Sequence, residues 1–232
     1  MSPAPAPPSP RTRTLKVCGA TSTRDIDVLA TAGADLAGLW HGVPGGPAEL
    51  PEREVAALAA AARATGVLHP VLVTFLSDTH ALSGALARTG IGTVQLHAYQ
   101  RPSTVRALRA ALPDAVIIKV LHVTGDTCLE RPLLGAYEQA GTDLFLIDAT
   151  TPDGRVGSTG QCLSEDTVLD LADRFTLPFW LAGGLTPANR SDHERLLHHP
   201  RLHGIDVDTA ARGGDGRIAG PAVTRLARVW GT

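Results

Sequence analysis

Cysteine is scarce in this chain of 232 residues, which has three cysteines, at positions 18, 128 and 162. The number is odd, and no two of them have the CxxC spacing. Neither a disulfide framework nor a zinc site held by cysteines is therefore expected. A reduced, cytoplasmic location is the simplest interpretation of this cysteine usage.

Long hydrophobic runs and an excess of charge of one sign are also missing. No apolar stretch approaches the roughly 18 residues that a membrane-spanning helix needs. The 21 basic and 23 acidic residues nearly balance, which gives a formal net charge of −2. We therefore expect neither a nucleic acid nor a membrane as partner, but a small-molecule substrate.

Residues 1–13 have no pattern that could build a core. They are rich in proline, and apart from Met1 their only hydrophobic residue type is alanine. We expect a disordered tail here, because such a composition cannot bury an apolar face. The segment also lacks the apolar stretch of a signal peptide.

From residue 14 onwards, short apolar runs alternate with stretches rich in alanine, leucine and arginine. The apolar runs are predicted strands, at residues 14–18, 35–40, 68–75, 93–97, 115–123, 143–149, 178–184 and 204–208. The stretches that follow them are predicted helices, at residues 25–34, 51–66, 77–90, 102–113, 130–141, 164–175, 187–199 and 219–230. The pattern therefore predicts eight strand–helix units.

The nearly continuous apolar character of the predicted strands indicates a parallel sheet that is buried on both faces. Eight successive strand–helix units are typical of a closed (β/α)8 barrel, which needs roughly 200 to 250 residues. We therefore predict an α/β fold with a single barrel domain over residues 14–232. An open doubly wound sheet is the alternative, although the GxGxxG fingerprint is absent after the first strand.

In such a barrel, the active site lies at the carboxyl ends of the strands. The candidates are the polar, aromatic and glycine residues that close each strand. They are Cys18, Trp40, His41, Phe75, Gln95, His97, Lys119, His122, Asp148, Gly183, Gly184, Asp206 and Asp208.

Six segments at these strand ends resemble, in the same order, the motifs of one enzyme family. They are LKVCGATS, VQLHAYQ, IIKVLHV, LFLIDATTPDGRVGSTGQCLS, PFWLAGGLTPANR and GIDVDTAAR, which together run from residue 15 to about residue 212. The family is phosphoribosylanthranilate isomerase of tryptophan biosynthesis. The resemblance implies a cofactor-independent isomerase that converts an aminoaldose into an aminoketose, an Amadori rearrangement.

The resemblance assigns the general base to the cysteine of K-x-C-G, Cys18, and the general acid to Asp148 at the end of the sixth strand. A thiol ionises more readily beside positive charge, and Cys18 would face a site built for an anion. Asp148 follows an apolar strand, where burial would favour its protonated, acidic form. Alternatively, Cys18 is a small buried hydrophobic residue and Asp148 a turn or cap residue.

The same motifs supply candidate substrate-binding residues, and we expect no metal. They are Gln95, His97, Lys119, Thr159, Gly160, Gly183, Gly184, Asp206, Asp208 and Arg212. Residues 149–162 are expected to form a flexible active-site loop.

Two departures from the family concern the ends of the substrate. The second loop, HGVPGGPAEL, has no arginine before Arg53, whereas the family's S-P-R arginine is associated with the anthranilate end. The phosphate-binding turn reads Asp208-Thr209-Ala210 in place of S-S-G, which adds a carboxylate and removes a glycine. Arg212 could compensate for the charge, or Asp208 could simply cap the next helix.

Three hypotheses therefore remain open for the function. The first is a phosphoribosylanthranilate isomerase, acting as a monomer or homodimer on a phosphosugar amine. The second is a diverged enzyme that uses Cys18 and Asp148 on another small molecule in specialised metabolism. The third is a barrel that binds a ligand without catalysis.

Overall fold

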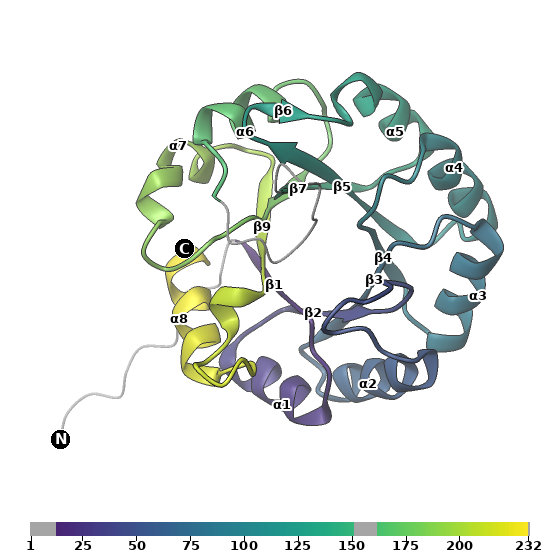
Figure 1. Ribbon diagram of the computed structural model, residues 1–232, viewed down its shortest axis with the longest axis vertical. Coiled ribbons are helices and arrows are strands. Elements are labelled where there is room, and N and C mark those ends of the chain that lie inside the picture. Colours follow the sequence, from purple (N-terminus) through teal and green to yellow (C-terminus); the bar gives the residue numbers. More distant parts are fainter. Residues whose placement is uncertain (1–12, 151–161, 232) are drawn as a thin grey trace.

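Parallel strands form a closed ring in the computed structural model, which describes residues 13–150 and 162–231. Figure 1 shows the ring of strands face-on, with the helices packed around its outside. The parallel strands are β1 (Thr14–Cys18), β2 (Leu36–Trp40), β3 (His69–Thr74), β4 (Thr93–Leu96), β5 (Val116–Thr124), β7 (Leu144–Ala149), β8 (Phe179–Leu181) and β9 (Leu202–Val207). Pairing of β1 with β9 and of β4 with β5 closes the barrel. The predicted (β/α)8 barrel is confirmed.

A helix follows each of these strands and covers the outer face of the barrel. The helices are α1 (Thr23–Ala32), α2 (Glu52–Ala64), α3 (Thr79–Thr89), α4 (Pro102–Ala111), α5 (Leu134–Ala140), α6 (Glu165–Ala172), α7 (Glu194–Leu197) and α8 (Gly220–Trp230). Side chains cap several of them: Ser22 accepts a hydrogen bond from the backbone N–H of Asp25, and Asp78 accepts one from that of Ala81. Such caps satisfy N–H groups that a helix leaves unpaired in its first turn.

The alternation of side chains along each strand divides the core into two layers. The outer layer packs between the strands and the helices, and it includes Leu15 and Val17 of β1. The inner layer fills the barrel itself, with Cys18, Val71, Val73, Ile118, Val120, Leu144, Leu146, Trp180 and Ala182. Polar side chains that point inward must therefore lie inside the barrel or at its open ends.

The structure differs from the predicted elements in two places. The seventh helix is short, because residues 190–193 form a 3-10 turn, η2 (Arg190–His193), before α7. A short strand that the sequence did not predict, β6 (Thr127–Cys128), pairs antiparallel with the end of β5. Of the predicted tail, residues 1–12 lie outside the described residues, as do residues 151–161 of the predicted loop.

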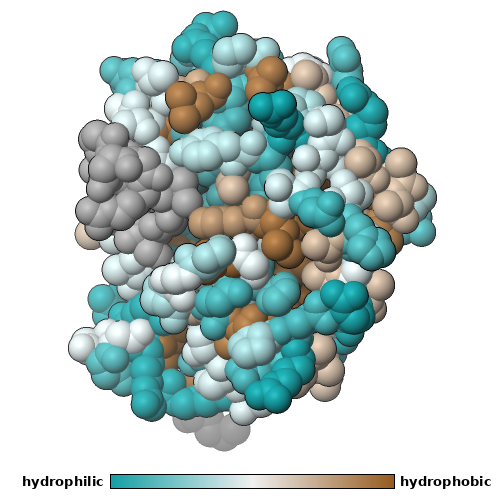
Figure 2. Space-filling model, turned by 45° about the vertical axis from the view of Figure 1, so that its right-hand side comes forward, coloured by the Kyte–Doolittle hydropathy of each residue, from teal (hydrophilic) through white to brown (hydrophobic). Residues whose placement is uncertain are grey.

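Hydrophilic side chains predominate on the face shown in Figure 2, where hydrophobic side chains form separate patches among them. No helix in the described ranges has both the length and the apolar character needed to cross a membrane.

Candidate active site

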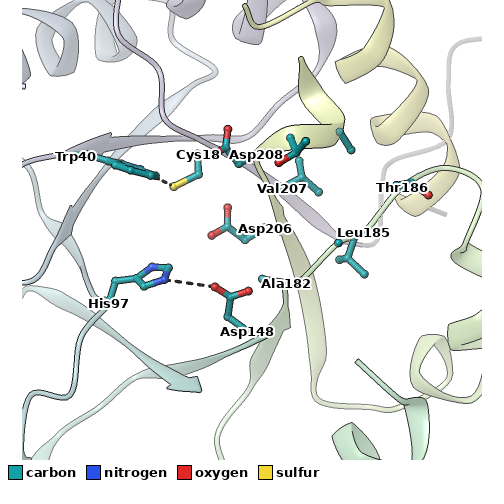
Figure 3. A pocket seen from close by; sticks show the side chains of 14 residues that line it. Cys18, Trp40, His97, Asp148, Ala182, Leu185, Thr186, Asp206, Val207 and Asp208 are labelled. Atoms are coloured by element: carbon teal, nitrogen blue, oxygen red, sulfur yellow. Dashed lines mark hydrogen bonds and ion pairs between the residues drawn. The ribbon is translucent and has the colours of Figure 1, made fainter. Parts of the chain in front are cut away.

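A pocket of about 190 Å³ opens at the carboxyl ends of the strands, where a barrel of this kind holds its active site. Figure 3 shows the side chains around it. The described residues that line it are Cys18, Trp40, His97, Asp148, Ala182, Gly183, Gly184, Leu185, Thr186, Asp206, Val207, Asp208, Thr209 and Ala210. The structure therefore brings Cys18 and Asp148, the predicted base and acid, into one pocket.

Strand alternation explains why these side chains reach the pocket. Leu15 and Val17 belong to the outer core. Lys16 and Cys18, which alternate with them along β1, therefore point into the barrel. On β9, Ile205 packs in the outer core, and the next residue, Asp206, lines the pocket. Cys18 and Asp206 thus occupy the last inward positions of β1 and β9.

Cys18 is 5% exposed and receives polar contacts from its own strand, β1, and from the neighbouring strand, β2. The indole Nε1 of Trp40 donates a hydrogen bond to its Sγ over 3.0 Å, and the Nζ of Lys16 lies 3.4 Å from the same atom. Burial nevertheless raises the pKa of Cys18 to about 12, against the effect of Lys16 and with the help of Asp206 and Asp208. The direction is opposite to the expectation that the site would lower the pKa of Cys18.

Lys16 forms a fully buried ion pair with Asp206. The Nζ of Lys16 lies 2.8 Å from Oδ2 of Asp206, and the two side chains are 0% and 6% exposed. Burial opposes the charge of Lys16, but Asp206 and Cys18 outweigh it and raise the pKa of Lys16. The other oxygen of the carboxylate, Oδ1, has no hydrogen-bond partner among the described residues.

Asp148 closes β7 and faces His97 from β4. Oδ2 of Asp148 lies 3.4 Å from Nε2 of His97, and both residues are buried. On the other side of the imidazole, Nδ1 contacts Nε2 of Gln95 at 2.8 Å. Asp206 lies between Cys18 and the Asp148–His97 pair (Figure 3), so that the acid and the base occupy opposite sides of the pocket.

Gly183 and Gly184 form the turn after β8, with backbone φ angles of 87° and 62°. These angles favour glycine, because a Cβ atom would be strained there. In the described ranges no hydrogen bond engages the backbone N–H of either glycine, and both line the pocket. Asn189 braces the turn, since its Nδ2 donates to the carbonyl of Gly184 over 3.0 Å and its Oδ1 accepts from the N–H of Thr186 over 2.8 Å.

Asp208 does not cap the 3-10 turn η3 (Thr209–Ala211) with its side chain, contrary to one alternative. Its carboxylate instead pairs with Arg212, whose Nε and Nη2 lie 2.7 Å and 2.6 Å from Oδ1. Arg212 also donates to the carbonyl oxygens of Gly216 and Gly19. Arg212 thus balances the charge of Asp208, but it is not one of the described residues that line the pocket.

Two further predicted substrate-binding residues do not reach the pocket. Lys119 points outward because its neighbours Ile118 and Val120 pack in the inner core, and its Nζ donates to the carbonyl of Ala98 over 2.9 Å. Gln95 is 0% exposed and orients His97 from behind. Thr159 and Gly160 lie outside the described residues.

The sequence prediction missed Lys16 as a member of the site and named Trp40 only as a strand-end residue. Lys16 stands two positions before Cys18, which places it on the same face of β1. That spacing was the signal that could have identified it. Within the described residues, no group of three or more His, Cys, Asp or Glu side chains is arranged to hold a metal ion.

Residues 15–211 match the family model described as N-(5'phosphoribosyl)anthranilate (PRA) isomerase. The chain is 29% identical over 203 residues to N-(5'-phosphoribosyl)anthranilate isomerase 2 of Methanosarcina mazei, covering 87% of each chain. It is 30% identical over 217 residues to the N-(5'-phosphoribosyl)anthranilate isomerase of Haloarcula marismortui, covering 92% of this chain and 94% of that protein.

A solved structure of phosphoribosyl anthranilate isomerase, in complex with reduced 1-(O-carboxyphenylamino)-1-deoxyribulose 5-phosphate, is similar in fold. Its TM-score is 0.72 at 19% sequence identity, and the match covers 94% of this chain and 97% of that chain. At this identity the likeness concerns the fold.

Proposed function

The chain belongs to the phosphoribosylanthranilate isomerase family, and from that premise we propose that its pocket isomerises N-(5'-phosphoribosyl)anthranilate to the corresponding aminoketose. The observation that carries the proposal is the placement of Cys18 and Asp148 on two sides of one pocket. An Amadori rearrangement needs both an acid and a base within reach of one sugar. The comparisons favour this function over the diverged enzyme and the non-catalytic barrel.

In the proposed first step, Asp148 donates a proton to the ring oxygen of the ribose. The bond between C1 and the ring oxygen breaks, and the nitrogen lone pair forms a positively charged iminium at C1. His97 holds the carboxyl group of Asp148 in position through the 3.4 Å contact.

In the second step, Cys18 removes the proton from C2 of the opened sugar, and the electron pair forms an enol that rearranges to the ketone. Burial raises the pKa of Cys18 to about 12, so that the thiol is protonated before the first step. The thiol proton passes to solvent through the open pocket before Cys18 accepts the proton of C2. The iminium formed in the first step adds a positive charge to the pocket, and a nearby opposite charge favours the resulting thiolate. The acid step thereby prepares the base step.

The two ends of the substrate find different partners in this proposal. The free N–H groups of Gly183 and Gly184 suit a phosphate, and Arg212 offsets the carboxylate of Asp208 beside them. The ring of Trp40 offers an aromatic surface to the anthranilate end. The related protein solved with a reduced carboxyphenylamino-deoxyribulose phosphate supports this class of ligand. A cytoplasmic location and a monomeric or homodimeric state complete the proposal.

Turnover by the purified protein tests this function. We expect the aminoketose to form from N-(5'-phosphoribosyl)anthranilate faster than in buffer, with chromatographic detection of the product. The double variant Cys18→Ala/Asp148→Asn is the matched control, since it keeps the fold and removes both proton-transfer groups. Product formation at the buffer rate, together with failure to rescue a tryptophan auxotroph, would exclude the isomerase.

A further inference from the structure

Two N–H donors, one fully buried and one half-buried, converge on the sulfur of Cys18 from the adjacent strands β1 and β2. One is the ammonium of Lys16 on β1, 3.4 Å from Sγ, and the other is the indole of Trp40 at the end of β2, 3.0 Å away. Lys16 is 0% exposed, so water does not screen its charge. A sulfur held between a cation and a neutral donor is in an arrangement that favours its anionic form.

Tight packing against Gly38 limits where the ammonium of Lys16 and the sulfur of Cys18 can lie. A Cβ atom at Gly38 on β2 would lie 2.8 Å from Sγ of Cys18 and 3.1 Å from Nζ of Lys16. The absence of a side chain at Gly38 therefore gives the ammonium and the sulfur the space in which they meet. A larger residue there would have to move one of them.

The charge of Lys16 is divided between two neighbours. Its Nζ lies closer to Asp206, at 2.8 Å, than to Cys18, at 3.4 Å. Asp206 therefore holds the ammonium in place and also neutralises much of its effect on the sulfur. The negative groups that face Cys18 are Asp206 and Asp208, and Asp148 and His97 face Asp206 in turn.

We propose that Lys16 and Trp40 are positioning residues that stabilise the thiolate of Cys18, and that the charge of Asp206 sets how strongly Lys16 does so. The proposal rests on the proposed function, in which Cys18 is the base. Asp206 is the closer partner of the ammonium, and its charge favours the protonated thiol. A substrate hydroxyl that donates to Oδ1 of Asp206, which has no partner among the described residues, would weaken the hold of Asp206 on Lys16 and strengthen the effect of Lys16 on the sulfur.

Alkylation of Cys18 by iodoacetamide measures the thiolate directly, because only the thiolate reacts. The rate is followed at pH 9 by mass spectrometry, since trypsin releases Cys18, Cys128 and Cys162 in separate peptides. Lys16→Met is expected to slow the reaction of Cys18 about tenfold, and Asp206→Asn to speed it about tenfold, as nearby charges shift a pKa by one unit or more. Trp40→Phe, which removes a hydrogen bond, is expected to slow it about threefold.

The opposite signs separate electrostatics from packing. Both Lys16→Met and Asp206→Asn leave one member of the pair alone, and looser packing would speed alkylation in both variants. Lys119→Met, which removes another fully buried lysine, is the matched control and should leave the rate at Cys18 unchanged. If Lys16→Met loosens the fold, Cys128 reacts faster in the same sample. Asp206→Asn then decides the question, and its faster reaction at Cys18 supports the proposal only if Cys128 keeps its parent rate in that variant.

The proposal is overturned if alkylation of Cys18 is unchanged in both variants, or if Asp206→Asn slows it. Because the readout needs no substrate, it is independent of turnover. If the predicted alkylation pattern is seen without isomerase activity, the effect of Lys16 and Asp206 on the thiolate is confirmed and the proposed function is excluded. If isomerase activity is seen but the alkylation rates of Cys18 do not change, the proposed function stands and the proposed effect on the thiolate is excluded.

Discussion

Two buried clusters in this barrel each contain a lysine, a carboxylate and a cysteine. The pocket cluster consists of Lys16, Asp206 and Cys18 and lies at the open end of the barrel. The wall cluster, Lys119, Glu130, His122 and Cys128, lies around the end of β5 and the adjoining β6 hairpin. Similar groups are thus buried in two places, and only one of the clusters opens into the pocket.

The clusters differ in how completely their carboxylates are satisfied. In the wall cluster, Oε1 of Glu130 lies 2.6 Å from Nδ1 of His122, and Oε2 accepts the N–H of His122 over 3.0 Å. In the pocket cluster, Oδ1 of Asp206 has no partner among the described residues. Buried polar atoms are normally paired, so an unpaired one beside a pocket indicates a group kept for a ligand. The wall cluster therefore stabilises the fold, whereas the carboxylate of the pocket cluster remains available to a ligand.

Breaking the wall cluster should have the largest effect on stability. Glu130→Gln removes the anion that faces Lys119 and His122, and loss of one partner of a buried pair costs about 3 kcal/mol. Chemical denaturation of the parent and the variant measures the difference in the free energy of unfolding. Glu52→Gln is the control, since it breaks the exposed pair with Arg88 and should cost about 1 kcal/mol at most. Equal losses in both variants would contradict the assignment of the wall cluster.

The pH dependence of stability should also identify the wall cluster. Burial lowers the pKa of Lys119 from 10.5 to about 8, despite the opposing effect of Glu130. Between these values the unfolded chain binds more protons than the folded one, so Lys119 makes stability rise with pH from about 8 to about 10.5. The difference in unfolding free energy, parent minus Lys119→Met, should therefore rise by up to about 3 kcal/mol over this range. Subtraction cancels the titration of the cysteines, and a difference that stays flat would show that Lys119 is not desolvated.

A smaller perturbation tests the packing of the pocket cluster. Gly38→Ala places a Cβ atom within 2.8 Å of Sγ of Cys18, so the thiol must move. We expect kcat/KM for the isomerisation to fall about tenfold, because a small misplacement of a reacting group is costly. Gly92→Ala is the matched control, as no atom lies within 4 Å of the added Cβ. Parent-like activity of Gly38→Ala would show that the position of the sulfur is not critical.

The barrel and the position of the pocket could be predicted because they depend on local patterns, whereas the roles of Cys18 and Asp148 were implied by the resemblance to the family. Alternating apolar and helical segments define the strands, and the residues that close the strands define the site. Lys119 was misplaced because both faces of a barrel strand are apolar, so composition does not tell inward from outward positions. Its true orientation follows from Ile118 and Val120, which the structure places in the inner core.

Interactions between distant segments could not be predicted. The pairing of Lys16 with Asp206 joins residues 190 positions apart, on strands that meet only when the barrel closes. The high pKa of Cys18 has the same origin, because it depends on burial and on carboxylates from β9 and the turn after it. The K-x-C-G motif contains Lys16, but only the closed barrel gives its ammonium two neighbours.

We propose that Cys18 is the base and Asp148 the acid of the reaction. The most direct test is kcat/KM for the isomerisation of N-(5'-phosphoribosyl)anthranilate. Loss of a general acid or base lowers a rate by roughly 10²- to 10⁴-fold, and we expect this of Cys18→Ala and of Asp148→Asn. Cys128→Ala, in the wall cluster, should retain the parent value because Cys128 does not line the pocket within the described residues. Parent-like activity of either pocket variant, or an equal loss in Cys128→Ala, would contradict the account.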